Sequence, residues 1–119
     1  MIAVLFEVQI AGDGRDEYLR RATELRPEVE KIDGFVSIER FQSLADPTRL
    51  LSLSWWRDED AIARWRAHEQ HVRAQEAGRA RLFTDYRIRV ASLTREYGMR
   101  GPRDAAGEAK ETGTMGRGS

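Results

Sequence analysis

The chain has 119 residues and no cysteine, and its 20 lysine and arginine residues balance its 20 aspartate and glutamate residues. That length allows one domain with one hydrophobic core, and the zero net charge argues against a nucleic-acid binder, which would usually carry a basic excess. The lack of cysteine excludes disulfides, thiolate metal sites and cysteine nucleophiles, and it fits a reducing compartment.

The apolar N-terminal stretch does not have the pattern of a signal peptide. It lacks a basic lead-in and a small-residue cleavage site, and Glu7 and Gln9 interrupt it. No apolar run approaches the roughly 20 residues that span a bilayer. We therefore expect a cytoplasmic protein that does not associate with membranes.

The first two elements are a strand and a helix. Apolar and other residues alternate with a period of two from Ile2 to Ile10, which predicts a β-strand. Apolar residues at helical spacing predict a helix over residues 13–32, with Asp13 or Asp16 as its N-cap. Pro27 lies inside this span, so we expect it to kink the helix or to divide it.

The next elements are a hairpin and a second helix. Residues 35–43 and 49–56 both have strand character, and the short turn "ADPT" between them predicts an antiparallel hairpin. The stretch "RDEDAIARW" then opens a helix, with Asp58 and Asp60 as candidate caps. This helix is expected to reach Gly78 or a little beyond.

Residues 84–97 predict a fourth strand, and the chain changes character after it. Tyr86, Ile88 and Val90 should face one side of this strand, and Arg87, Arg89, Ala91 and Leu93 the other. Residues 99–119 are rich in glycine and charge, contain no aromatic residue and show no period. We therefore expect a domain over residues 1–98 and a tail, 99–119, that is disordered or held by a partner chain.

The order β-α-β-β-α-β predicts an α+β, ferredoxin-like sheet with both helices on one face. The third strand is apolar on both sides, with Leu51, Leu53 and Trp55 facing one way and Leu50 and Trp56 the other. Because two helices cover one face only, the second face would be an exposed apolar surface. We expect a symmetric homodimer in which two sheets pack together as an α/β barrel.

The candidate site lies in the stretch "WRAHEQHVRAQEAGR", which holds both histidines of the chain. On a helical wheel Trp65 lies at the centre of the apolar stripe, His68 and Gln75 lie on its edge, and His71 lies further round. Trp65 could be a core anchor with the histidines as boundary residues. Alternatively, a histidine could act as the base in a small-molecule pocket between this helix and the sheet.

Two further hypotheses concern metals. A divalent ion shared by His68 and His71 would need a third ligand, for which the sequence offers Glu7, Glu39 or Glu69 at no diagnostic spacing, so we predict no metal site. Haem with an axial histidine is the other hypothesis.

A glycine-rich phosphate loop and a serine in a nucleophile elbow are both missing from the sequence.

The strand order, "DGF" after the first helix, "SWW" at the end of the third strand and the pattern "W…H…AQ..GR..F..YRIRV" carry a family resemblance. The chain resembles the antibiotic biosynthesis monooxygenase domain family, over about residues 1–98. The resemblance implies a dimeric α/β barrel and two catalytic options.

In the first option a small oxygenase without metal or flavin oxidises a phenolic or quinol-type aromatic compound with O2. The resemblance then implies catalytic roles for His71 or His68 and substrate contacts from Trp65 and Tyr86. The second option is haem degradation, which in the family uses a strand asparagine, a helix tryptophan and a later histidine. Trp65 matches that tryptophan, whereas Glu7 and Gln75 occupy the other two positions.

We therefore expect a homodimeric, cofactor-independent monooxygenase that acts on a small aromatic or quinone-type substrate. The candidate catalytic residues are His71 and His68, and the candidate substrate-binding residues are Trp65, Tyr86, Glu7 and Gln75. A haem protein and a non-catalytic ligand-binding or accessory protein on the same fold are the alternatives.

Overall fold

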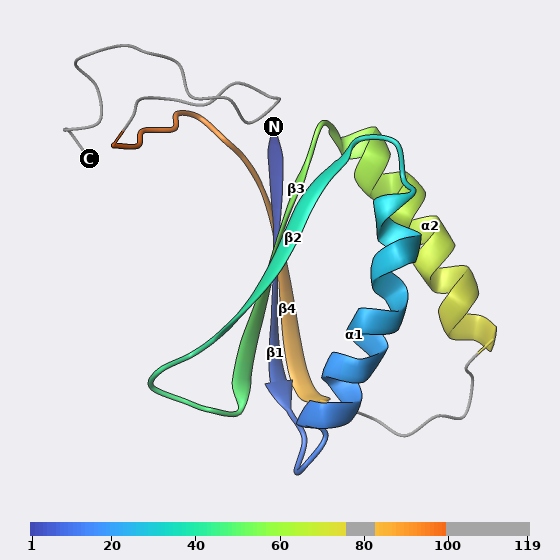
Figure 1. The fold of residues 1–119 in the computed structure, drawn as a ribbon, viewed down its shortest axis with the longest axis vertical. Helices are drawn as coiled ribbons and strands as arrows, with labels where there is room; N and C mark the ends of the chain where they lie inside the picture. Colours follow the sequence, from blue (N-terminus) through green and yellow to red (C-terminus); the bar gives the residue numbers. More distant parts are fainter. Residues whose placement is uncertain (76–82, 100–119) are drawn as a thin grey trace.

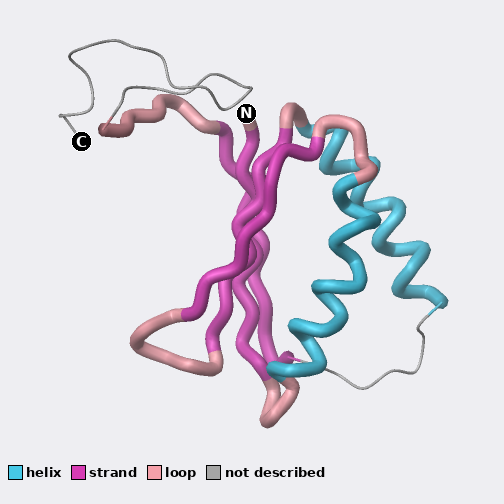
Figure 2. Tube along the Cα trace, in the orientation of Figure 1, coloured by secondary structure: helices cyan, strands magenta, loops and turns pink. Residues whose placement is uncertain are grey.

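The computed structural model describes residues 1–75 and 83–99, which form a four-stranded antiparallel sheet with two helices on one face (Figures 1 and 2). In chain order the elements are β1 (Ile2–Ile10), α1 (Arg15–Glu30), β2 (Phe35–Gln42), β3 (Arg49–Trp56), α2 (Glu59–Gln75) and β4 (Phe83–Ser92). The strands lie in the order β2-β3-β1-β4. This arrangement confirms the predicted ferredoxin-like α+β class. Among the described helices, none is long and apolar enough to cross a membrane.

Helix α1 differs from its prediction at the start and at the proline. Its N-cap is Gly14, and no side chain caps it, so the prediction of Asp13 or Asp16 as the cap is wrong. Pro27 lies inside a single helix and does not divide it. Because Pro27 is only three residues from the end, its missing N–H costs one hydrogen bond in the last turn, where the helix is about to stop anyway.

The hairpin and the start of α2 agree with the sequence. β2 and β3 pair antiparallel, and the backbone N–H of Ala61 donates to Oδ1 of Asp58 at 2.9 Å, which confirms Asp58 as a cap. β4 ends at Ser92, five residues before the predicted end of the fourth strand. The predicted end of the second helix near Gly78 and the predicted tail beyond Met99 lie outside the described residues.

The register assigns every strand residue to one of two faces. Ile2, Val4, Phe6, Val8 and Ile10 face the helices, and their cross-strand partners share that face, among them Leu50, Ser52, Ser54 and Trp56 on β3. The apolar side chains on this face form two separate clusters. One is built on Val8, Ile10, Tyr18 and Leu50, and the other on Val29, Trp56, Ala61 and Ile62.

Two small polar residues lie between these clusters. Ser52 and Ser54 are each 6 % exposed, and Ser54 Oγ accepts a hydrogen bond from Trp56 Nε1 at 2.8 Å. Serine fills far less volume than the leucine and tryptophan on either side of it in β3. The middle of the helix-facing side therefore holds small, buried polar side chains, whereas both ends are filled by large apolar side chains.

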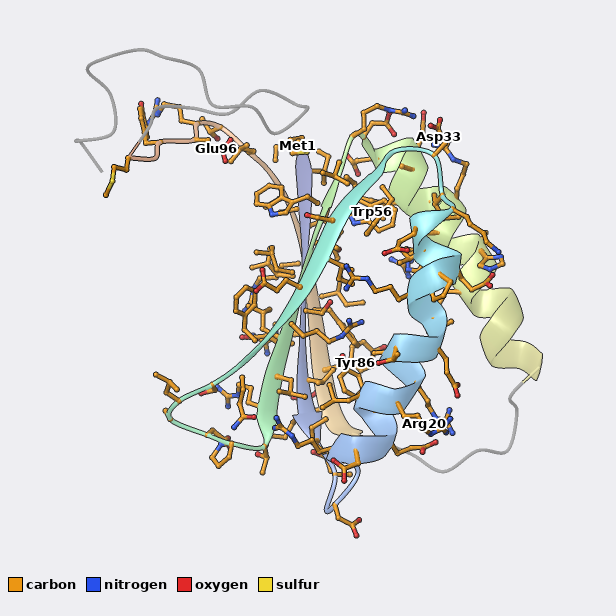
Figure 3. All side chains as sticks on the ribbon, viewed as in Figure 1. Met1, Arg20, Asp33, Trp56, Tyr86 and Glu96 are labelled. Atoms are coloured by element: carbon orange, nitrogen blue, oxygen red, sulfur yellow. The ribbon has the colours of Figure 1, made fainter. Side chains whose placement is uncertain are left out.

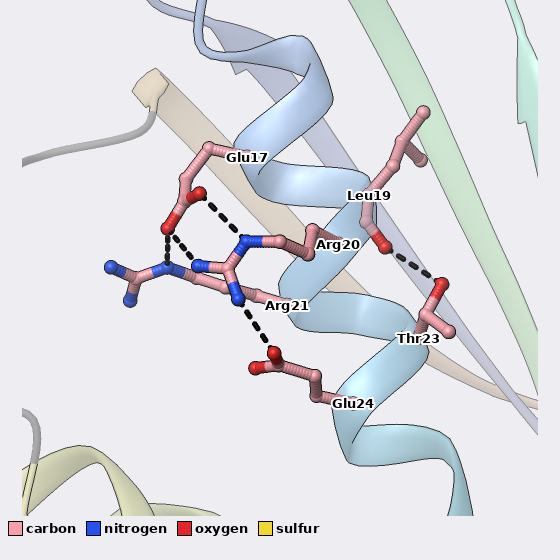
Figure 4. A network of polar contacts seen from close by, with 6 residues as sticks. All are labelled: Glu17, Leu19, Arg20, Arg21, Thr23 and Glu24. Atoms are coloured by element: carbon pink, nitrogen blue, oxygen red, sulfur yellow. Dashed lines mark hydrogen bonds and ion pairs between the residues drawn. The ribbon is translucent and has the colours of Figure 1, made fainter.

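The outer face of α1 is covered by charge pairs that centre on Glu17 (Figure 4). Its carboxylate accepts hydrogen bonds from Arg20 at 3.0 and 2.5 Å and from Arg21 at 2.8 Å. The Arg20 bonds, and then those from Arg21, lower the pKa of Glu17 from 4.5 to about 2.

This pKa predicts acid sensitivity. A carboxyl whose pKa is lower in the folded chain stabilises it fully above pH 4.5, and that contribution disappears as the pH falls toward 2. Glu17→Gln should therefore lower the midpoint of thermal unfolding at pH 7, and the difference from wild type should vanish near pH 2. Glu30→Gln, which removes a single bond from Arg26, is the control and should have a smaller effect at pH 7. A difference for Glu17→Gln that is independent of pH would contradict the assignment.

Candidate functional site

A tight turn positions α2 over the sheet. Gly34 has φ +98°, and a Cβ at this position would lie 2.6 Å from Cβ of Ala61. Only glycine accommodates both that backbone conformation and such close approach. Arg57 also bridges the turn, since its backbone N–H donates to Gly34 O at 2.7 Å and its side chain pairs with Asp33 at 3.1 Å. The start of α2 is thereby held against the sheet.

Two turns into α2, Trp65 and His68 lie on neighbouring positions of one helix face. Trp65 is half-buried and packs against the cluster that contains Trp56 and Val29. The ring centroids of Trp65 and His68 are 5.8 Å apart, with the planes tilted by 40°. This contact agrees with the helical wheel, which places His68 on the edge of the apolar stripe that is centred on Trp65.

A carboxylate from the other helix holds the His68 ring. Nε2 of His68 lies 2.9 Å from Oε1 of Glu28, and the two side chains are 37 % and 38 % exposed. An ionised carboxylate can only accept, so Glu28 favours the imidazole with its proton on Nε2. Nδ1 is then the nitrogen that can accept a proton from another molecule. Sequence reasoning missed Glu28, because 40 residues separate it from His68 and no local spacing links them.

The edge strand β4 contributes an apolar row on the helix-facing side of the sheet. Tyr86, Ile88 and Val90 pair with Val8, Phe6 and Val4, so they face the helices, yet they are 57 %, 43 % and 49 % exposed. The rings of Tyr86 and Phe6 lie 5.8 Å apart, and Figure 3 shows Tyr86 between the sheet and α1. Exposed apolar side chains on the helix-facing side of a sheet provide a surface for a flat apolar ligand.

We call the set of Phe6, Ser52, Trp65, His68 and Tyr86 the helix-side site. These residues lie on the helix-facing side of the sheet or on α2 above it, and they comprise three aromatic rings, a half-exposed imidazole held by Glu28, and the buried hydroxyl of Ser52. Such a site can hold a small ring compound and accept one proton from it.

The other predicted site residues lie elsewhere or outside the description. Glu7 lies on the opposite face of the sheet, where its Oε1 pairs with Arg89 at 3.2 Å. It alternates with Phe6 along β1, so its side chain points away from the helices. His71 and Gln75 belong to the last turns of α2, and their side chains lie outside the described residues. In the described part of the chain, no three histidine or acidic side chains gather as a metal site would require.

The fold and the helix-side site define a ferredoxin-like domain with an imidazole and an apolar row on its helix-facing side. A family model described as antibiotic biosynthesis monooxygenase matches residues 1–77. The chain therefore belongs to the antibiotic biosynthesis monooxygenase family.

Two solved structures share the fold. SnoaB, a cofactor-independent oxygenase from Streptomyces nogalater, aligns over 80 % of this chain and 94 % of its own, with a TM-score of 0.65 and 16 % identity. A MhuD variant with two manganese protoporphyrin IX molecules per active site aligns over 82 % and 99 %, with a TM-score of 0.67 and 16 % identity. At such identities the likeness concerns the fold alone.

One relative is much closer in sequence. A protein of Pyricularia oryzae named jasmonate monooxygenase is 46 % identical over 94 residues, which cover 79 % of this chain and 44 % of that protein. This chain spans about half the length of the sequence relatives that it matches.

Proposed function

We propose that the chain is a monooxygenase that oxidises a small aromatic or quinol-type compound with O2 at the helix-side site, without metal or flavin. The observation that carries this proposal is the His68–Glu28 pair, 2.9 Å apart, next to the ring of Trp65. Membership of the family supports oxygenase chemistry. The apolar row of β4 provides a surface on which a flat substrate can lie.

The chemistry requires little from the protein beyond a base and an apolar surface. Nδ1 of His68 removes a proton from a methylene group that two aromatic rings activate, which leaves an electron-rich anion. That anion reduces O2, and the carbon–oxygen bond forms. The methylene becomes a carbonyl, one oxygen atom stays in the product, the other leaves as water, and no external reductant is consumed. Glu28 accepts the hydrogen bond from Nε2 and so keeps the ring in place during this step.

An oxygen-uptake assay tests this function. Anthrone carries such a methylene group, and chelator-treated, flavin-free protein should consume one O2 for each anthrone without releasing hydrogen peroxide. No uptake above spontaneous oxidation would favour the non-catalytic alternative. Uptake that depends on added flavin, metal or haem would contradict the cofactor-independent mechanism.

We also propose that the chain works as a homodimer that forms through the outer face of the sheet. Leu5, Leu51, Leu53 and Trp55 lie on this face without a helix to cover them. A groove of about 440 Å³ on the same face is lined by residues that include Trp55, Leu93 and Tyr97. An apolar face of this kind favours association, and the Glu7–Arg89 pair gives it a polar centre.

Leu53→Arg is expected to abolish the dimer. Leu53 lies directly opposite Leu5 in the middle of the face. Burying the unpaired charge of an arginine there would cost several kcal/mol of association free energy. Sedimentation equilibrium should give twice the 13.7 kDa of the chain for wild type and the single mass for the variant. Leu44→Arg changes a fully exposed turn residue in the same way and should remain a dimer. A monomeric wild type would contradict the proposal.

A further inference from the structure

Arg40 is a cation on the helix-facing side of the sheet. It pairs across β2 and β3 with Ser52, which pairs with Phe6 on β1, which pairs with Ile88 on β4. Arg40 therefore stands in the same cross-strand row as Ser52 and Phe6 of the helix-side site and as Ile88 on β4. Phe6 lies two strands away from it. Adjacent strands are about 4.8 Å apart, so Arg40 and Phe6, two strands apart, lie roughly 10 Å from each other across the sheet.

The guanidinium of Arg40 is partly buried, and its buried nitrogen makes no hydrogen bond that would offset the loss of water. Its Nε is buried and has no hydrogen-bond partner. A buried donor without a partner is costly, and the cost is greater for a charged group. Among the described residues, no carboxylate pairs with Arg40, although acidic side chains are numerous on the neighbouring helix.

Four glutamates of α1 are engaged with side chains other than Arg40. Glu17 and Glu24 bond Arg20, Glu28 bonds His68, and Glu30 bonds Arg26. On the sheet, Glu39 pairs with Leu53 in the register and so faces the opposite side. The fold thus brings a cation to the helix-facing side, and the described part of the chain provides no counter-ion for it.

We propose that Arg40 binds the carboxylate of an acidic substrate, whose ring lies toward Phe6 and Ile88. This inference rests on the proposed function and narrows its substrate class to small cyclic acids. Arg40 as a whole is only half-buried, and a carboxylate accepts from the terminal Nη groups of its guanidinium, which supplies the charge with a counter-ion. Ser52, opposite Arg40 in the register, carries no charge that could compete for the guanidinium. Arg40 is in this account a substrate-binding residue, whereas His68 remains the base.

Binding measured by calorimetry under nitrogen tests this role without turnover. The probes are 1-hydroxy-2-naphthoic acid and jasmonic acid, each compared with its methyl ester, which keeps the ring and removes the charge. Wild type should bind at least one acid about tenfold or more tightly than its ester. Arg40→Met should lose that preference and keep its affinity for the ester. Arg26→Met removes an exposed cation whose Nη1 contacts the same strand at Ile38 O, and it should keep the preference.

NMR of the wild-type protein tests the role of Arg40 even if the Arg40→Met variant does not fold. In wild type labelled with ¹⁵N, the Nε–H signal that is absent from Arg40→Lys identifies Arg40, and it should shift with the acid but not with the ester. An acid preference that persists in Arg40→Met, an Arg40 signal unmoved by a bound acid, or failure of both acids to bind would each overturn the inference. Acid-specific binding through Arg40 without any oxygen uptake would refute the proposed function alone. Oxygen uptake on neutral substrates without acid preference would refute only the role of Arg40.

Discussion

Trp56→Ala is expected to lower the free energy of unfolding by about 3–5 kcal/mol, the range for deleting a large buried aromatic side chain. Trp56 is 2 % exposed and lies in the cluster that supports Trp65. Its ring meets that of Phe35 edge-on at 5.3 Å and 75°, and its Nε1 donates to Ser54 at 2.8 Å. The change leaves a cavity beneath α2 and leaves Ser54 without this donor. Urea unfolding followed by circular dichroism measures the loss.

The neighbouring tryptophan is a matched control for this prediction. Trp55 faces the other side of the sheet, and it is only half-buried. Trp55→Ala should cost distinctly less free energy in a dilute sample, and its cost should depend on protein concentration because it acts through the proposed dimer. Equal losses for the two variants would mean that the assignment of faces in β3 is wrong.

His68→Ala is expected to lower kcat for anthrone by about 10²–10⁴, the usual contribution of a positioned general base. KM should change less, because Trp65 and Phe6 still provide the apolar surface. The fold should persist because the His68 side chain is 37 % exposed. An unaltered circular dichroism spectrum would verify this. Single-turnover rates with saturating substrate separate the chemical step from binding.

Two further variants define the role of His68 more closely. Glu28→Gln keeps the shape of the partner but weakens its hold on the ring, so it should lower kcat less than His68→Ala. His71→Ala tests the second histidine that the sequence offers. Turnover that survives both His68→Ala and His71→Ala would show that neither histidine is the base.

The fold was largely predictable because its strands repeat with a period of two. The third strand has the predicted bounds, Arg49–Trp56, and its two apolar faces correctly separate Trp55 from Trp56. The predicted caps of the first helix failed, because backbone geometry at Gly14 replaces a side-chain bond there. Pro27 was overrated as a helix breaker because its position close to the end could not be judged before the helix boundary was known.

The site was less predictable than the fold. The wheel correctly placed Trp65 beside His68, since both belong to one helix. It could not reveal Glu28, whose contact with His68 depends on how two helices pack. The grouping of Glu7 with Trp65 joined residues from opposite faces of the sheet. Arg40 did carry a signal, because it follows Ile38 at a spacing of two in β2, and a charged residue at an inward position is unusual.

Isotope incorporation from ¹⁸O2 tests directly whether the chain is a cofactor-independent monooxygenase with His68 as its base. Chelator-treated protein with no flavin or haem absorbance would be mixed with anthrone under ¹⁸O2, and the product mass would be recorded for wild type and for His68→Ala. Wild type should introduce one ¹⁸O atom into the carbonyl product, and His68→Ala should form this product about 10²–10⁴ times more slowly. Product oxygen that comes from water, or equal labelled product from wild type, His68→Ala and buffer, would contradict it.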